Sequence, residues 1–270
     1  MAHVSSLVVY PVKGCQGVQA EEALVLPTGL AFDRHWLVVA GDSGRFYSQR
    51  NEANPGACGV IKSCRYSAAS SHFALAVQIP LAAVIGQLEE RRVICWEWKG
   101  NARDEGEAAA QWVSEVVGQP SRLVRFIGVP GTNDAAADTS ERRRPAVPIG
   151  WGRIPGHETA FCDRLPFLLT TEASLAKLNE LLGEEQAVPM HRFRPNVVVT
   201  TVDQKTLKSG KEPLHMLSTF RSLQHLKHKF PESKYPSKAI FFGNLCTAIG
   251  HGIIRVGDSV SRELRDGPME

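Results

Sequence analysis

The sequence is poor in cysteine, has no long apolar run and carries no large excess of one charge. Six cysteines in 270 residues stand at irregular spacings without a Cys-x-x-Cys pair, which excludes a disulfide scaffold and favours reduced, intracellular thiols. The most apolar window, 73–88, is broken by Gln78, Pro80 and Gly86 and is shorter than the ~20 residues that a membrane span needs. The first residues lack a basic stretch followed by an apolar one, so we expect neither a secretory signal nor a transmembrane segment.

The charge balance and the missing motifs exclude further classes. Lys and Arg exceed Asp and Glu by only 3, which does not favour binding to nucleic acid. There is no Gly-rich dinucleotide fingerprint, no P-loop and no zinc-protease helix. The pair His225 and His228 has metal-ligand spacing, but it stands among lysines and is interpreted as part of a solvated basic segment. The 43% hydrophobic content is enough for a folded core.

Short runs of β-branched and aromatic residues dominate what is present, and they predict a mainly β protein. In the first half the predicted strands are Val4–Tyr10, Gln19–Leu26, Trp36–Ala40, Phe73–Ile79, Val93–Trp98 and Leu123–Ile127. A hairpin turn is predicted at 41–44, and a helix around Ala109–Val116 is predicted to end at Gly118.

The second half follows a stretch, 128–153, that lacks periodicity and is interpreted as a linker or surface loop. Phe167–Leu169 is predicted to be a strand leading into a helix, with Thr170 or Thr171 as its N-cap and Gly183 as its stop. The remaining predicted elements are a strand at Val197–Thr200, a short helix at Pro213–Arg221, and strands at Ala239–Gly243 and Ile253–Val260.

Cations and amides stand at the ends of several predicted strands. Lys13 and Gly14 combine a cation with a bare backbone amide, which suits a phosphate or another anion. Arg34 beside Asp33 is either half of a structural ion pair or a cation held for a ligand. Arg194 and Asn196 precede an apolar strand, where an unpaired charge is costly, so contact with an anionic ligand is favoured. These motifs predict an anionic, phosphorylated ligand between two halves of the chain, with a cofactor carrying the chemistry.

The order of the motifs resembles that of the MOSC proteins, and among them the amidoxime-reducing components and their plant relatives. The resemblance runs from Ser6 to Val260. It is carried by Tyr-Pro-Val-Lys-Gly-Cys, Pro-Thr-Gly-Leu-x-x-Asp-Arg-x-Trp-Leu-Val-Val, Trp-Glu-Trp-x-Gly, Asp-Glu-Gly-Glu-x-Ala-x-Gln-Trp, Pro-Phe-Leu-Leu, Ala-Ser-Leu-x-x-Leu-Asn, Arg-Phe-Arg-Pro-Asn and Val-Gly-Asp-Ser-Val.

The resemblance implies an α+β, mainly β fold: a MOSC N-terminal β-barrel-like domain over 1–127, a linker over 128–153, and a MOSC β-barrel domain with a few helices over 154–264. It also implies the molybdenum cofactor, a phosphate-bearing molybdopterin, and reduction of small N-hydroxylated compounds with electrons from cytochrome b5 and its NADH-dependent reductase. The implied location is cytoplasmic or mitochondria-associated. Matched by position, the cofactor-binding residues are Lys13, Gly14, Arg34, Asp163, Arg194 and Asn196.

One family element has no counterpart in this sequence. Family members carry further strands and a Cys-Ser-Arg-Cys-like segment after Arg-Phe-Arg-Pro-Asn, and a cysteine there ligates molybdenum. In this chain Val197–Val199 runs directly into Thr200–Gln204, which resembles what normally follows that segment. The MOSC barrel is therefore expected to be shortened after Val199, and no catalytic or metal-ligating residue is assigned. The alternative function is a catalytically impaired isoform or a non-catalytic binder or carrier of the cofactor.

Overall fold

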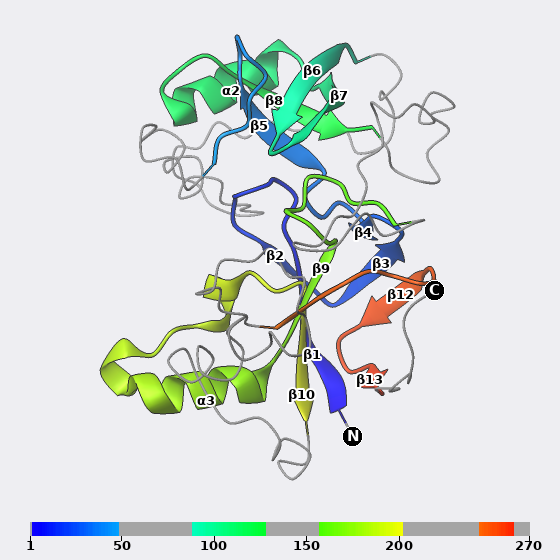
Figure 1. Cartoon of the computed structure of the whole chain (residues 1–270), viewed down its shortest axis with the longest axis vertical. Helices are drawn as coiled ribbons and strands as arrows, with labels where there is room; N and C mark the ends of the chain where they lie inside the picture. The colour runs from blue at the N-terminus through cyan, green and yellow to red at the C-terminus, as the bar shows by residue number, and fades with distance from the viewer. Residues whose placement is uncertain (1, 49–87, 128–156, 202–242, 262–270) are drawn as a thin grey trace, which may run out of the picture.

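The fold consists mainly of strands. The computed structural model describes residues 2–48, 88–127, 157–201 and 243–261. Within them, two α-helices, α2 (Glu107–Val117) and α3 (Glu172–Leu182), accompany three sheets (Figure 1). Neither of these helices is long and apolar enough to cross a membrane. The mainly β fold predicted from the sequence is confirmed.

One four-stranded antiparallel sheet lies beside α2. Its order is β5 (Trp36–Ala40), β8 (Ser121–Phe126), β7 (Trp98–Asp104) and β6 (Glu90–Cys95). Strand β5 is apolar throughout because both of its faces are covered. Trp36 and Val38 pack with α2, whereas Leu37 and Val39 belong to a second apolar cluster on the other face, together with Phe126 and Phe161.

A larger sheet joins the start of the chain to its later parts. Its order is β11 (Asn244–Cys246), β9 (Phe167–Thr171), β10 (Val197–Thr201), β1 (Ala2–Val9) and β13 (Ser259–Val260), and β2 (Val18–Ala20) also pairs with β1. Strands β9 and β10 run parallel with α3 between them in the chain, and β1 is antiparallel to β10. Val4, Leu7, Val197 and Val199 form part of its apolar core.

Two predicted strands are each divided in the structure. The run 19–26 becomes β2 and β3 (Glu22–Leu26), and the run 253–260 becomes β12 (Gly252–Arg255) and β13. Strand β3 pairs with β4 (Gly29–Leu30) and β12 in a three-stranded sheet of its own. The breaks at Glu21 and Val256 face each other, because the Val256 amide donates to the Glu21 carbonyl at 2.9 Å. Both chain segments therefore pass from one sheet to another at the same corner.

Several predictions lie outside the described residues. These are the strand Phe73–Ile79, the linker 128–153, the helix Pro213–Arg221, the pair His225 and His228, and most of the strand Ala239–Gly243. The domain boundaries at 127 and 153 stay predictions. Strands β1 and β3 pair with β10, β13 and β12, so the hydrogen-bonded sheets combine residues from both ends of the chain.

The N-cap of α3 supplies a first testable prediction. The Thr171 side chain accepts a hydrogen bond from the Ser174 amide at 3.1 Å, which satisfies one of the free donors at the helix start. We expect Thr171→Ala to lower the free energy of unfolding by about 1 kcal/mol in urea titrations. Thr171→Ser keeps the accepting oxygen and should stay close to the parent protein. Equal losses in both variants would show that the threonine methyl group, rather than the cap, is what matters.

Candidate anion-binding site

Four loops meet where the sheets approach one another. They are residues 10–15 after β1, 31–35 before β5, 157–166 before β9, and the segment from the short helix η3 (Met190–Phe193) to β10. Backbone hydrogen bonds join the first three: Arg34 N–H to the Tyr10 carbonyl at 2.7 Å, and Phe161 N–H to the Arg34 carbonyl at 2.9 Å. The predicted site residues, scattered over 184 positions of the sequence, all lie on these four loops.

Lys13 and Asp163 form one end of the site. The Lys13 ammonium donates to the Phe161 carbonyl at 2.8 Å and is paired with the Asp163 carboxylate. That carboxylate also accepts a 3.0 Å hydrogen bond from the Trp96 indole, although the Asp163 side chain remains 61% exposed. An incoming anion would thus meet a buried ammonium whose present partner faces solvent. Gly14 adopts φ 83°, a left-handed conformation that favours glycine.

Arg34 is the most constrained cation of the site. Its guanidinium pairs with the fully buried Asp33 carboxylate and donates to Asn196 Oδ1 at 2.9 Å and to the Arg194 carbonyl at 3.4 Å. Burial works against the charged guanidinium, but the neighbouring Asp33 charge outweighs it and raises the pKa of Arg34. The structure therefore supports the ion-pair reading of Asp33 and Arg34, with the cation fixed in place at neutral pH.

Arg194 has a different environment. It adopts left-handed backbone angles (φ 56°), and its guanidinium carbon lies 4.3 Å from the centroid of the Tyr10 ring. No carboxylate of the described residues pairs with it. Burial and the nearby Arg34 charge both lower the pKa of Arg194 below its usual value. This combination of a half-buried cation, a like-charged neighbour and no carboxylate is what an anion site requires.

Asn196 connects the site to the large sheet. Its side-chain oxygen accepts from the Arg34 guanidinium and from the Leu168 amide at 3.2 Å, and its side-chain nitrogen donates to the Val8 carbonyl at 3.2 Å. Both lone pairs of this oxygen are occupied. Asn196 would therefore act on a bound ligand through its contact with Arg34. Its assignment as a cofactor-binding residue stays a prediction.

Backbone strain gathers at the same loops. Four non-glycine residues of the described chain have positive φ, namely Phe32, Arg34, Trp96 and Arg194. Each lies on a loop of the site or, in the case of Trp96, contacts Asp163. Such conformations cost about 1–3 kcal/mol each and persist where surrounding structure enforces them, commonly at binding sites.

The described thiols do not form a metal site. Cys15, Cys95 and Cys162 are buried, and burial raises the pKa values of Cys162 and Cys246, which keeps these two thiols protonated. Cys15, which follows the Lys13 loop, packs in the apolar cluster below α2. Over the described ranges, no three His, Cys, Asp or Glu side chains are grouped as metal ligands. The cysteines Cys58 and Cys64 lie outside these ranges.

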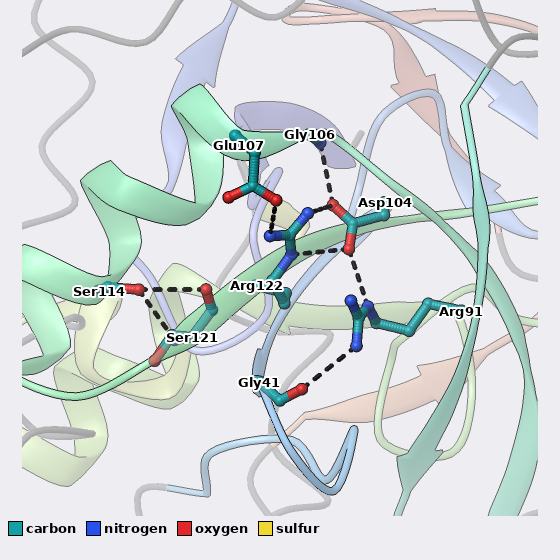
Figure 2. Close-up of polar contacts among 8 residues, drawn as sticks. All are labelled: Gly41, Arg91, Asp104, Gly106, Glu107, Ser114, Ser121 and Arg122. Carbon is teal, nitrogen blue, oxygen red and sulfur yellow. Dashed lines mark hydrogen bonds and ion pairs between the residues drawn. The ribbon is translucent and has the colours of Figure 1, made fainter.

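A second polar cluster lies near the start of α2 (Figure 2). Asp104 accepts 2.8 Å hydrogen bonds from Arg91 and from Arg122, and Glu107 pairs with the opposite side of the Arg122 guanidinium. Burial raises the pKa of Asp104, but the bonds from Arg122, the Gly106 amide and Arg91 outweigh it and lower that pKa overall. Two arginines are matched by two carboxylates here, so this cluster offers no unbalanced charge to a ligand.

Sequence reasoning missed Tyr10 and Trp96 as site residues. The sequence predicted Tyr10 as the end of a strand, and an aromatic residue there reads as part of the core. Only the fold places its ring beside Arg34 and Arg194, each with its guanidinium carbon 4.3 Å from the ring centroid. Trp96 stands at the turn between β6 and β7, and its contact with Asp163 joins residues 67 positions apart. The sequence holds one signal for them, because Tyr10 opens the motif Tyr-Pro-Val-Lys-Gly-Cys and Trp96 opens the motif Trp-Glu-Trp-x-Gly.

Comparisons with known proteins fit this architecture. The MOSC N-terminal beta barrel domain model matches residues 1–120, and the MOSC domain model matches residues 156–218. Human mitochondrial amidoxime-reducing component 1 is 30% identical over 298 aligned residues, covering 95% of this chain and 82% of that protein. The mouse component 1 is 31% identical over 304 residues, with 95% and 81% covered, and bovine component 2 is 31% identical over 297, with 95% and 82% covered.

The human relative contains segments that this chain lacks. The aligned stretch of 298 residues is longer than the 270 residues of the chain, so the human relative has segments with no counterpart here. Two domain models in family order and about 30% identity over nearly the whole chain establish the relationship. The chain belongs to the MOSC family, alongside the mitochondrial amidoxime-reducing components.

Proposed function

We propose that this protein binds the molybdenum cofactor and is an oxidoreductase of the amidoxime-reducing type. The relatives' names provide the reaction class, and the proposal extends it to this chain: reduction of small N-hydroxylated compounds. Each reduction consumes two electrons and two protons and releases water. The proposed electron source is cytochrome b5 with its NADH-dependent reductase, and the proposed location is intracellular, in the cytoplasm or associated with mitochondria.

The observation that carries the proposal is the unbalanced positive charge of the site. Among the residues that the structure describes, Lys13, Arg34 and Arg194 form ion pairs with two carboxylates, Asp33 and Asp163, and Arg194 pairs with neither. A phosphate group would supply the missing negative charge.

The residues present fit the phosphate-bearing part of the cofactor. Lys13, Arg34 and Arg194 would hold that end, with Asn196 and Asp33 fixing Arg34. When bound, the cofactor supplies the redox centre. The residues of this chain would bind and orient it. Asp163 is exposed and pairs with Lys13, so the Lys13 ammonium could exchange this carboxylate for the ligand.

The alternative, an impaired isoform or a non-catalytic binder of the cofactor, rests on a separate observation. Burial keeps Cys162 protonated, and Cys15 and Cys95 are enclosed in apolar clusters. Strand β11, at the edge of the sheet as far as the structure describes it, leaves Leu245 half exposed, and Ile249 after it is 94% exposed. Uncovered apolar residues at a sheet edge agree with a shortened barrel.

Molybdenum and pterin content of the purified chain tests the proposal. The chain would be produced in a host that makes the cofactor, next to a version with a relative's Cys-Ser-Arg-Cys segment inserted after Val199. We expect pterin in both and more molybdenum in the restored version, because a thiolate retains the metal. Arg194→Ala should reduce the pterin content roughly 10-fold or more, since a charge-assisted hydrogen bond contributes about 1.5–3 kcal/mol.

The outcomes separate the candidate functions. Pterin together with reduction of an amidoxime by a reconstituted cytochrome b5 chain supports the oxidoreductase. Pterin without turnover supports the non-catalytic binder. Absence of pterin from a folded parent chain would contradict both.

A further inference from the structure

Tyr10 lies in contact with both arginines of the site. Tyr10 is 3% exposed, and the guanidinium carbons of Arg34 and Arg194 each lie 4.3 Å from the centroid of its ring. A guanidinium at this distance is attracted by the negative face of an aromatic ring, most strongly where water is excluded. Tyr10 is thus the one side chain among the described residues that contacts both cations through its ring.

The contact of the Tyr10 ring with the two arginines offsets the repulsion between their charges. Arg34 and Arg194 come from loops 160 positions apart in the chain, and the Arg34 guanidinium donates to the Arg194 carbonyl. Asp33 forms its ion pair with Arg34, and no carboxylate in the described part of the chain pairs with Arg194. The Tyr10 ring supplies an attraction that does not consume the positive charge, so both guanidinium groups keep hydrogen-bond donors for a ligand.

Gly17 makes room for this ring. A Cβ atom on Gly17 would lie 2.5 Å from Tyr10 Cε1 and 2.5 Å from Val8 Cγ1, far inside contact distance. The Tyr10 ring cannot yield freely, because two guanidinium groups pack against it. A side chain at residue 17 would therefore displace the ring from the arginines.

We propose that Tyr10 is a positioning residue that holds Arg34 and Arg194 together as a two-arginine clamp for a phosphate group. Its ring has room there because residue 17 is a glycine. The inference rests on the proposed function, since the clamp serves its phosphate site, and it assigns a role to two residues outside the predicted set. The ring carries the role. The hydroxyl has no partner among the described residues, so the positioning does not depend on it.

Calorimetric titration of the full chain with orthophosphate and with pyrophosphate tests the clamp. Tyr10→Leu keeps an apolar side chain but removes the ring, and we expect roughly tenfold weaker binding from the loss of two buried cation–π contacts. Tyr10→Phe keeps the ring and should bind within about twofold of the parent protein, with an unchanged or higher thermal midpoint. Gly17→Ala should weaken binding as Tyr10→Leu does.

Gly252→Ala is the matched control. Gly252 lies in β12 with open space around the position of a Cβ, so this variant should bind phosphate as the parent protein does. Near-ultraviolet circular dichroism identifies any variant that does not fold, and Gly17→Ala keeps the test decisive if Tyr10→Leu fails in this way.

The failures of the two proposals can be told apart. If Arg194→Ala abolishes phosphate binding while Tyr10→Leu and Gly17→Ala bind normally, the phosphate site stands and the role of Tyr10 is overturned. Equal losses in Tyr10→Phe and Tyr10→Leu would overturn it too, because the hydroxyl would then carry the effect. If the parent chain binds neither anion, the phosphate site fails and the clamp with it.

Discussion

Replacing Asp33 by asparagine is expected to remove about 3–5 kcal/mol of the free energy of unfolding. The carboxylate is fully buried, pairs with Arg34 and accepts the Tyr10 backbone N–H at 2.8 Å. Asparagine can still accept from that amide, but it leaves the Arg34 guanidinium buried without its counter-charge. Since domains are stable by only about 5–15 kcal/mol, Asp33→Asn should stand close to unfolding in urea titrations.

A matched ion pair at the surface serves as the control. Lys177 and Glu180 on α3 pair at 2.8 Å with side chains 41% and 64% exposed, so Glu180→Gln should change stability by less than about 1 kcal/mol. If Asp33→Asn costs no more than Glu180→Gln, the buried pair does not hold the loops together, and the position of Arg34 must be set by Asn196 and the backbone.

Acidification is expected to destabilise the protein through His35. Burial, with a smaller contribution from Arg125, lowers the pKa of His35 from 6.5 to about 4. The unfolded chain therefore binds a proton that the folded chain excludes between about pH 6.5 and pH 4, and stability falls as the pH falls through this window. The loss approaches about 3 kcal/mol by pH 4, since one pKa unit corresponds to about 1.4 kcal/mol.

His35→Phe isolates this contribution. It keeps a ring next to Phe32 and Trp36 but removes the titrating group, whose Nε2 is buried without a partner among the described residues. The difference in unfolding free energy between parent and variant should shift by about 3 kcal/mol between pH 7 and pH 4. His251→Gln, at an exposed position, should change the unfolding free energy by less than about 0.5 kcal/mol at pH 7. Parallel profiles for the parent and His35→Phe would show that His35 becomes protonated in the folded state.

Local patterns predicted those elements whose bounds are set by the residues of the segment itself. Trp36–Ala40 is β5 without adjustment, and Gly118 ends α2 in a left-handed conformation, as predicted. Thr171, one of two predicted caps, is the N-cap of α3. The division of 19–26 into β2 and β3 was not predictable, because it depends on pairing with β12 more than two hundred positions away. Composition within a segment carries no information about which sheet each part joins.

The site residues, too, were predictable only where the information is local. Cations at strand ends predicted Lys13, Arg34 and Arg194, and the fold brings their loops together. The sequence does not indicate that the side-chain oxygen of Asn196 accepts hydrogen bonds from Leu168 and Arg34, because those contacts span 28 and 162 positions. The pairing of both arginines with Tyr10 depends equally on the fold. Residue types thus predicted the charge of the site, and long-range packing determines which charges remain available.

The pairing of β1 has a consequence for the making of the protein. His3 lies opposite Thr200 on one side and Ser259 on the other, so β1 leaves the ribosome long before either of these neighbours. At about 5–20 residues per second, translation to β10 takes on the order of ten seconds or more. Strand β2 can pair with the end of β1 early, but the edge that meets β10 and the part that meets β13 stay open throughout this interval. We therefore expect nascent chains to depend on chaperones, and refolding to be slow because its decisive contacts are so distant in sequence.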